Sequence, residues 1–192
     1  MNTKKVILIA SLITLAILSF IAYKNQIIPW KKYDTKLDSL FLGIGFGMEK
    51  QAFYDRCMEL NKEGKTIQGT QNTSVLYIDN ENFKLPADMN FYPNFHNDKI
   101  FAMPIYFNYK AWAPWNRELQ SDSLILEVKS LLEKWYGPGF KDKKLESGRV
   151  GYFKIDSPRI ITIKIRDEQF VDVLIENVKY SANDKQEENA QK

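Results

Sequence analysis

The sequence predicts an α+β protein in which an N-terminal transmembrane helix precedes one domain of two helices packed on an antiparallel sheet. The segment 6–23 carries no charged side chain. Beyond it, two stretches with apolar residues at helical spacing are each followed by short β-rich segments separated by turn residues. This order predicts two successive units, helix–meander and helix–meander, with the helices covering one face of the sheet.

The apolar segment Val6–Tyr23 is bracketed by Lys5 and Lys24. As an α-helix it would rise about 27 Å, close to the roughly 30 Å of hydrocarbon in a bilayer. A cleaved signal peptide is the alternative. Its apolar run is commonly shorter and ends in a small-x-small site, whereas Phe20 occupies the −3 position of a cleavage after Ala22. We therefore expect an anchor in the lipid bilayer, with cleavage left open.

The remaining boundaries follow from composition. Residues 1–5 form a short flank, 24–40 a stalk without periodicity, 41–180 the folded domain and 181–192 a polar, disordered tail. Lysines lie on both sides of the apolar segment, so the positive-inside rule gives no strong bias. A very short leading segment is typical of uncleaved signals. It predicts a cytoplasmic N-terminus and an extracytoplasmic domain, periplasmic in a Gram-negative cell.

The first predicted unit of the domain opens with a helix over Met48–Asn61. Phe53, Cys57 and Leu60 fall at the spacing of one helical face, which predicts that they pack in the core. The segment Thr73–Asp79 then alternates as a strand does and runs into turn residues.

A hairpin is predicted next, from Met89–Phe95 and Lys99–Tyr109 around the turn at 96–98. Proline has no N–H to donate to a ladder. Pro93 and Pro104 therefore predict that these strands lie at an edge or carry bulges.

The second unit opens with the clearest soluble helix. Oxygens at 121–123 are expected to cap it, Gly137-Pro138-Gly139 to end it, and an apolar stripe to face the core. The stripe comprises Leu124, Ile125, Val128, Leu131, Leu132 and Trp135, and the strands that follow it are Arg149–Ile155, Arg159–Arg166 and Phe170–Glu176.

Composition and charge narrow the function classes. The net charge is +3 with both signs mixed along the chain, which argues against the concentrated basic face of a nucleic-acid-binding protein. The single cysteine, Cys57, excludes an internal disulfide, and the single histidine, His96, argues against a histidine-based zinc site. We expect no metal site and no cofactor.

The candidate binding residues lie in one loop. Trp112 and Trp115 flank Ala113-Pro114, and Tyr109 and Asn116 bound the stretch. Two tryptophans beside a proline can stack on a sugar ring or on a peptide proline, with a large contact area at a small entropy cost. The alternative is that they plug the open end of the sheet and dock the loop onto the second helix.

Catalytic motifs are weak, and we predict no catalytic residue. Gly43-Ile44-Gly45-Phe46-Gly47 matches neither the dinucleotide pattern nor the Walker pattern, so we interpret it as a tight turn before a helix. The aspartates stand in turn or capping settings, and His96 falls in a hairpin turn without a G-x-S-x-G elbow. Cys57 lies on an apolar helix face, which favours packing over reactivity.

Two segments carry a resemblance to known families. FGMEKQAFYDRCMELNKEG and the later EKWYGPGF resemble motifs of uncharacterised exported or membrane-anchored proteins from Bacteroidota-type bacteria. The Gly47-Met48 opening and the Tyr136-Gly137-Pro138 closing are also distantly similar to small lipoproteins of the outer-membrane β-barrel assembly machinery. That likeness implies helices on a small antiparallel sheet acting as a binding scaffold. This chain departs from it because no cysteine follows the apolar segment to be acylated, so no functional residue is carried over.

These observations together predict a single-pass membrane-anchored protein with an extracytoplasmic binding or scaffold domain. Its expected partners are the bilayer, through 6–23, and an envelope protein or a glycan, but not nucleic acid. An envelope hydrolase and a structural subunit of a membrane complex are the alternatives.

Overall fold

The computed structural model describes residues 35–69, 74–78, 82–145 and 148–178 of the chain. The chain divides into two compact units, Met1–Asp34 and Thr35–Lys192, and all described residues belong to the second. The predicted anchor at 6–23, most of the predicted stalk and the predicted tail at 181–192 lie outside the described residues. Among the helices of the described part, none is long and apolar enough to cross a membrane.

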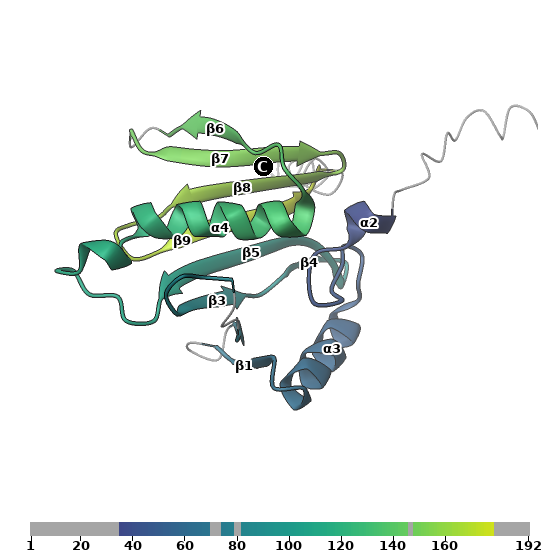
Figure 1. Cartoon of the computed structure of the whole chain (residues 1–192). Coiled ribbons are helices and arrows are strands. Elements are labelled where there is room, and N and C mark those ends of the chain that lie inside the picture. The colour runs from purple at the N-terminus through teal and green to yellow at the C-terminus, as the bar shows by residue number, and fades with distance from the viewer. Residues whose placement is uncertain (1–34, 70–73, 79–81, 146–147, 179–192) are drawn as a thin grey trace, which may run out of the picture. The chain divides into compact units, whose positions relative to one another are not determined.

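The described part is an α+β domain built on a nine-stranded antiparallel sheet (Figure 1). Its strand order is β1-β2-β3-β5-β9-β8-β7-β6, with β4 pairing beside β3 on the same edge of β5. The strands are β1 (Thr66–Gln68), β2 (Val75–Tyr77), β3 (Ala87–Phe91), β4 (Asn94–His96), β5 (Lys99–Tyr109), β6 (Lys141–Lys144), β7 (Val150–Asp156), β8 (Arg159–Ile165) and β9 (Val171–Asn177).

Two helices pack on this sheet, as the sequence predicted. Helix α4 (Ser121–Tyr136) lies across β5, β8 and β9, and α3 (Lys50–Lys62) contacts β1 (Figure 1). Two shorter helical segments, α2 (Thr35–Asp38) and the 3-10 helix η2 (Arg117–Leu119), precede α3 and α4. The order along the chain is therefore helix, strands, helix, strands.

The hydrophobic core lies between α4 and the sheet face that it covers. All residues of the predicted apolar stripe of α4 except the half-buried Trp135 are buried, and Phe53 and Leu60 of α3 are buried as well. On the sheet side the core comprises alternate residues of the central strands, among them Met103, Ile105, Phe107, Ile161, Ile163, Val171, Val173 and Ile175. Alternation follows from the pleat of a strand, which sends successive side chains to opposite faces.

The predicted hairpin is confirmed, but the position of Pro104 was predicted only in part. Asn97 and Asp98 take positive φ values of 48° and 58° in the turn between β4 and β5, as the tight turns of hairpins require. The register shifts between Asn94 and Phe95, so a bulge is present. However, β5 is a central strand and not an edge, because Pro104 pairs with Leu174 of β9 on one side while β3 and β4 pair on the other.

The ends of α4 differ in how well they were predicted. Gly137, at φ 80°, ends the helix, and its N–H donates to the carbonyl of Glu133. The expected cap from 121–123 is wrong, because the N-cap residue is Gln120 and its side chain makes no capping bond. Ser121 is instead buried, and its hydroxyl donates to the carbonyl of Asp167 at 2.6 Å.

The chain packs into the domain before Phe41. Leu40 is buried, and Ser39 bridges to Gly45 in an antiparallel pair. The Tyr136 hydroxyl donates to the Leu40 carbonyl at 3.0 Å, and Arg159 donates to the Ser39 carbonyl at 3.2 Å. The last residues of the predicted stalk therefore belong to the compact unit.

Candidate binding site

The four residues predicted to bind a ligand have different environments. Tyr109, at the end of β5, is 1% exposed and lies in the core. Its hydroxyl donates to the Glu127 carboxylate on α4 at 2.9 Å. Burial, together with this hydrogen bond, raises the pKa of the phenol well above its ordinary value. Tyr109 therefore supports the sheet and does not face a ligand.

The two tryptophans are separated by the fold. Trp112 is half-buried against the hydrophobic core, and its buried indole nitrogen has no hydrogen-bond partner among the residues that the structure describes. Trp115, in contrast, is 85% exposed. Of the two interpretations of this loop, packing fits Trp112 and presentation to a partner fits Trp115.

The loop that carries Trp115 is held by its own neighbours. The amide nitrogen of Gln120 lies within hydrogen-bond distance of three loop carbonyls, those of Ala113, Pro114 and Asn116, at 3.4, 3.5 and 3.0 Å. The Asn116 side chain accepts from the N–H of Glu118 at 3.1 Å and caps η2. The following Leu119 is buried, which fixes η2 to the core. Trp115 is therefore an exposed aromatic side chain on an ordered loop.

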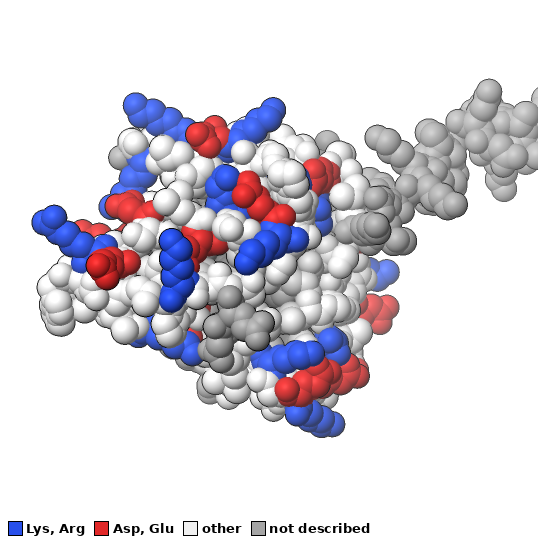
Figure 2. Space-filling model, in the orientation of Figure 1, with Lys and Arg blue, Asp and Glu red and all other residues white. Residues whose placement is uncertain are grey.

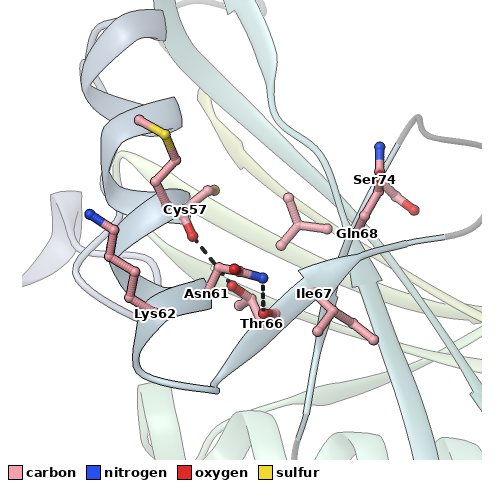
Figure 3. A pocket seen from close by; sticks show the side chains of 9 residues that line it. Cys57, Asn61, Lys62, Thr66, Ile67, Gln68 and Ser74 are labelled. Atoms are coloured by element: carbon pink, nitrogen blue, oxygen red, sulfur yellow. Dashed lines mark hydrogen bonds between the residues drawn. The ribbon is translucent and has the colours of Figure 1, made fainter.

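A second candidate is a cavity of about 470 Å³ between α3 and the β1–β2 pair (Figure 3). This volume falls within the range of small-ligand pockets. Asn61 donates to the carbonyl of Thr66 at 2.8 Å, which joins the end of α3 to β1. The lining consists of Cys57, Met58, Asn61, Lys62, Thr66, Ile67, Gln68, Ser74 and Val75.

The thiol in this cavity is not an activated nucleophile. Burial raises the pKa of Cys57 to about 11, against a smaller lowering by Arg56. The thiolate is the reactive form of cysteine, so at neutral pH this side chain is a protonated, unreactive thiol. The cavity offers apolar contact from Met58 and Ile67, which are both exposed, and amide groups from Asn61 and Gln68. Such a lining suits non-covalent binding.

The glycine segment before α3 lines a third hollow, of about 520 Å³, together with Asp38 and Glu49. A phosphate-binding loop needs free N–H groups. Here the N–H groups of Ile44, Phe46, Gly47 and Met48 donate to the carbonyls of Phe41, Asp38, Ile100 and Gly45. Because these donors are satisfied internally and the flanking side chains are acidic, the segment is a tight turn and not an anion site.

The remaining chemically versatile residues are dispersed. His96 ends β4 beside Asn97 and stacks edge-on with Phe101. Neither of the two cavities described above is lined by His96. Among the described residues, no group of three or more His, Cys, Asp or Glu side chains is placed to hold a metal ion.

Two features of these sites were not anticipated from the sequence. Strand β1 was missed because it is only three residues long and begins soon after α3, which leaves too short a segment for a strand pattern to be recognised. The role of Gln120 was missed because its bonds go to backbone carbonyls, which no side-chain motif reveals. Two apolar residues could have indicated the cavity between α3 and β1. Met58 lies off the predicted core face of its helix, and Ile67 lies outside every predicted element.

On the face that carries α4, Lys and Arg side chains are interspersed with Asp and Glu (Figure 2). Mixed charge of this kind does not form the continuous basic surface that nucleic acid requires. No protein-family model, no curated protein and no solved structure matches the chain.

Proposed function

We propose that the chain is a single-pass membrane protein whose α+β domain binds an envelope protein or a glycan. In this proposal the segment 6–23 is the anchor, the N-terminus is cytoplasmic and the domain is extracytoplasmic. The bilayer is its first partner, and the loop around Trp115 contacts the second. The support for the anchor is its uncharged apolar run between Lys5 and Lys24.

One observation carries the binding proposal: Trp115 is 85% exposed on a loop that Gln120 and Leu119 hold in place. Burying a side chain of this size contributes on the order of 2 kcal/mol or more to association. A fixed loop loses little conformational entropy when a partner covers it. Trp115 therefore has the properties of an aromatic anchor at an interface.

The proposal is tested by a photo-crosslinking amino acid introduced at position 115 of the full chain in its native membrane. Leu126 is the matched control, because it is also exposed, on the outer side of α4. We expect an adduct with a protein, or retention on purified peptidoglycan, from position 115 and not from position 126. Equal or absent adducts and equal retention at the two positions would contradict the proposal.

Alanine substitutions at Trp112 and Trp115 distinguish a role in binding from a role in packing. We expect Trp115→Ala to remove binding to the captured protein or to purified peptidoglycan while leaving the melting temperature unchanged, because the side chain contacts little of the domain. We expect Trp112→Ala to lower the melting temperature, because that side chain packs on the core. A large drop in melting temperature for Trp115→Ala would assign the loop to stability.

The orientation has its own test. Protease added to cells with a permeabilised outer envelope should digest the domain if it is extracytoplasmic. Protection of the domain in that experiment, with digestion only after lysis of the inner membrane, would reverse the assigned topology.

A further inference from the structure

The sheet face opposite α4 carries a group of lysines beside apolar residues on β6, β7 and β8. Antiparallel partners share a face, so the register places Lys141, Phe153 and Thr162 in one row. The next row contains Lys143, Gly151 and Lys164, whose positions follow from the same register. On the other side of the first row lie Ile155 and Ile160. We call Lys141, Lys143, Lys164, Phe153, Ile155 and Ile160 the β6–β8 patch.

The face is fixed by the residues that alternate with the patch. Lys154, between Phe153 and Ile155, is buried and donates to the Gly137 carbonyl at the end of α4. Ile161 and Ile163, on either side of Thr162, are buried in the core beneath α4. The patch residues therefore point away from α4.

The patch combines unpaired positive charge with exposed apolar surface. Its three lysines are exposed, and none forms an ion pair within the described part of the chain. Ile155 is 61% exposed and pairs with the apolar Ile160, one pair before the turn that closes the β7–β8 hairpin. The adjacent acidic residues belong to β9: Asp172 is bound by Arg166, and Glu176 also has a partner.

The alternative explanation is that lysines on an edge strand prevent the association of one sheet with another. That explanation covers Lys141 and Lys143 on the edge strand β6. It does not cover Lys164, which lies on the interior strand β8, or the exposed Ile155. A surface that needs both cations and apolar side chains on one face accounts for all of them.

We propose that the β6–β8 patch rests on the anionic surface of the lipid bilayer. Lysines are attracted to the negative surface potential of anionic lipids, and apolar side chains between them enter the headgroup region. This inference rests on the proposed membrane anchor, which keeps the domain near the bilayer.

The test uses the full chain mixed with two kinds of vesicle, one of phosphatidylcholine alone and one containing a third phosphatidylglycerol. Lysines are acetylated briefly, and the modified positions are quantified by mass spectrometry. We expect the anionic vesicles to slow acetylation of Lys141, Lys143 and Lys164 several-fold, with Lys62, Lys84 and Lys99 unchanged. The protection should disappear at about 0.5 M salt, because screening shortens the reach of surface charge.

Variants test the charge itself, with Lys143 kept as the reporter. In Lys141→Gln/Lys164→Gln the vesicle concentration that half-protects Lys143 should rise by on the order of 20-fold, since each lysine near an anionic surface contributes roughly fivefold to the affinity. The matched control, Lys62→Gln/Lys99→Gln, should keep the wild-type value. Both variants change exposed side chains, so their melting temperatures should match that of the wild type.

The outcomes separate this inference from the proposed anchor. Carbonate extraction of the same vesicles measures insertion, which does not depend on lipid charge. Selective protection without insertion would support the patch and refute the anchor. Three outcomes would refute binding of the patch to lipid: insertion without protection, equal protection by both kinds of vesicle, and protection that rises with protein concentration in detergent. The third outcome would indicate that the patch contacts a second copy of the chain.

Discussion

The substitution Asp156→Asn tests whether one carboxylate stabilises two buried cations. Asp156 forms ion pairs with Lys154 and with Arg159, each at 3.2 Å. The side chains of the two cations are only 9% and 5% exposed, and that of Asp156 is 25% exposed. The guanidinium of Arg159 also lies 4.4 Å from the centre of the Tyr136 ring. This cluster joins the β7–β8 hairpin to the end of α4 and, through Ser39, to the incoming chain.

The magnitude follows from the burial of the cations. Removing one partner of a buried ion pair costs about 3–5 kcal/mol, because the remaining charge stays desolvated without compensation. Asp156 keeps some solvent contact, so we expect about 3 kcal/mol for Asp156→Asn. In a domain of this size that corresponds to a drop in melting temperature of about 6–12 °C.

The matched control is Asp172→Asn. Asp172 also binds an arginine on the sheet, but that arginine, Arg166, is 47% exposed. We expect a cost of at most about 1 kcal/mol, as for other surface pairs. Urea unfolding of the full chain, followed by far-ultraviolet circular dichroism in one detergent, gives both free energies by linear extrapolation. If Asp156→Asn costs no more than Asp172→Asn at an unchanged m-value, burial of the two cations does not make Asp156 important for stability.

Three further predictions concern the core and the cavity. Leu132→Ala should lower the free energy of unfolding by about 2–5 kcal/mol, because Leu132 is fully buried, whereas Leu126→Ala, at an exposed position of the same helix, should change it by less than about 0.5 kcal/mol; urea unfolding compares the two. Tyr109→Phe should cost about 1–2 kcal/mol in the same assay, because it removes a hydrogen bond to the Glu127 carboxylate, and an unchanged midpoint would show that water replaces it. Alkylation of Cys57 by iodoacetamide should accelerate about tenfold per pH unit between pH 7 and 10, since a pKa raised to about 11 leaves the thiolate rare in this range; mass spectrometry follows the rate, and a plateau near pH 9 would contradict the assignment.

The elements that the sequence predicts well are those specified by local chemistry. The apolar stripe of α4 recurs with the period of a helix and ends at Gly137, whose φ of 80° suits glycine. The turn at Asn97-Asp98 is likewise specified by residues that tolerate positive φ. In each case the signal and the structure that it specifies lie within a few residues of one another.

The elements that the sequence misses depend on partners far along the chain. Strand β6 has the sequence Lys141-Asp142-Lys143-Lys144, which carries no apolar alternation because all four residues are exposed at an edge. The central place of β5 could not be inferred from Pro104, since it depends on pairing with β9. In the candidate site, the different burial of Trp112 and Trp115 depends on how the loop meets the core, and no local pattern distinguishes the two.

The position of β9 in the sheet has a consequence for synthesis. It is the last described strand to be made, yet it lies between β5 and β8 and provides the described strand pairing that joins β1–β5 to β6–β8. A growing chain can form the two groups separately, but it cannot join them until Val171–Asn177 is free to pair. Contacts as distant in sequence as Ala102 with Glu176 slow folding, because a long loop must close first. During synthesis, completion of this fold therefore waits until Val171–Asn177 has been made, and a chain that stops short of β9 has two unjoined sheets with exposed edges.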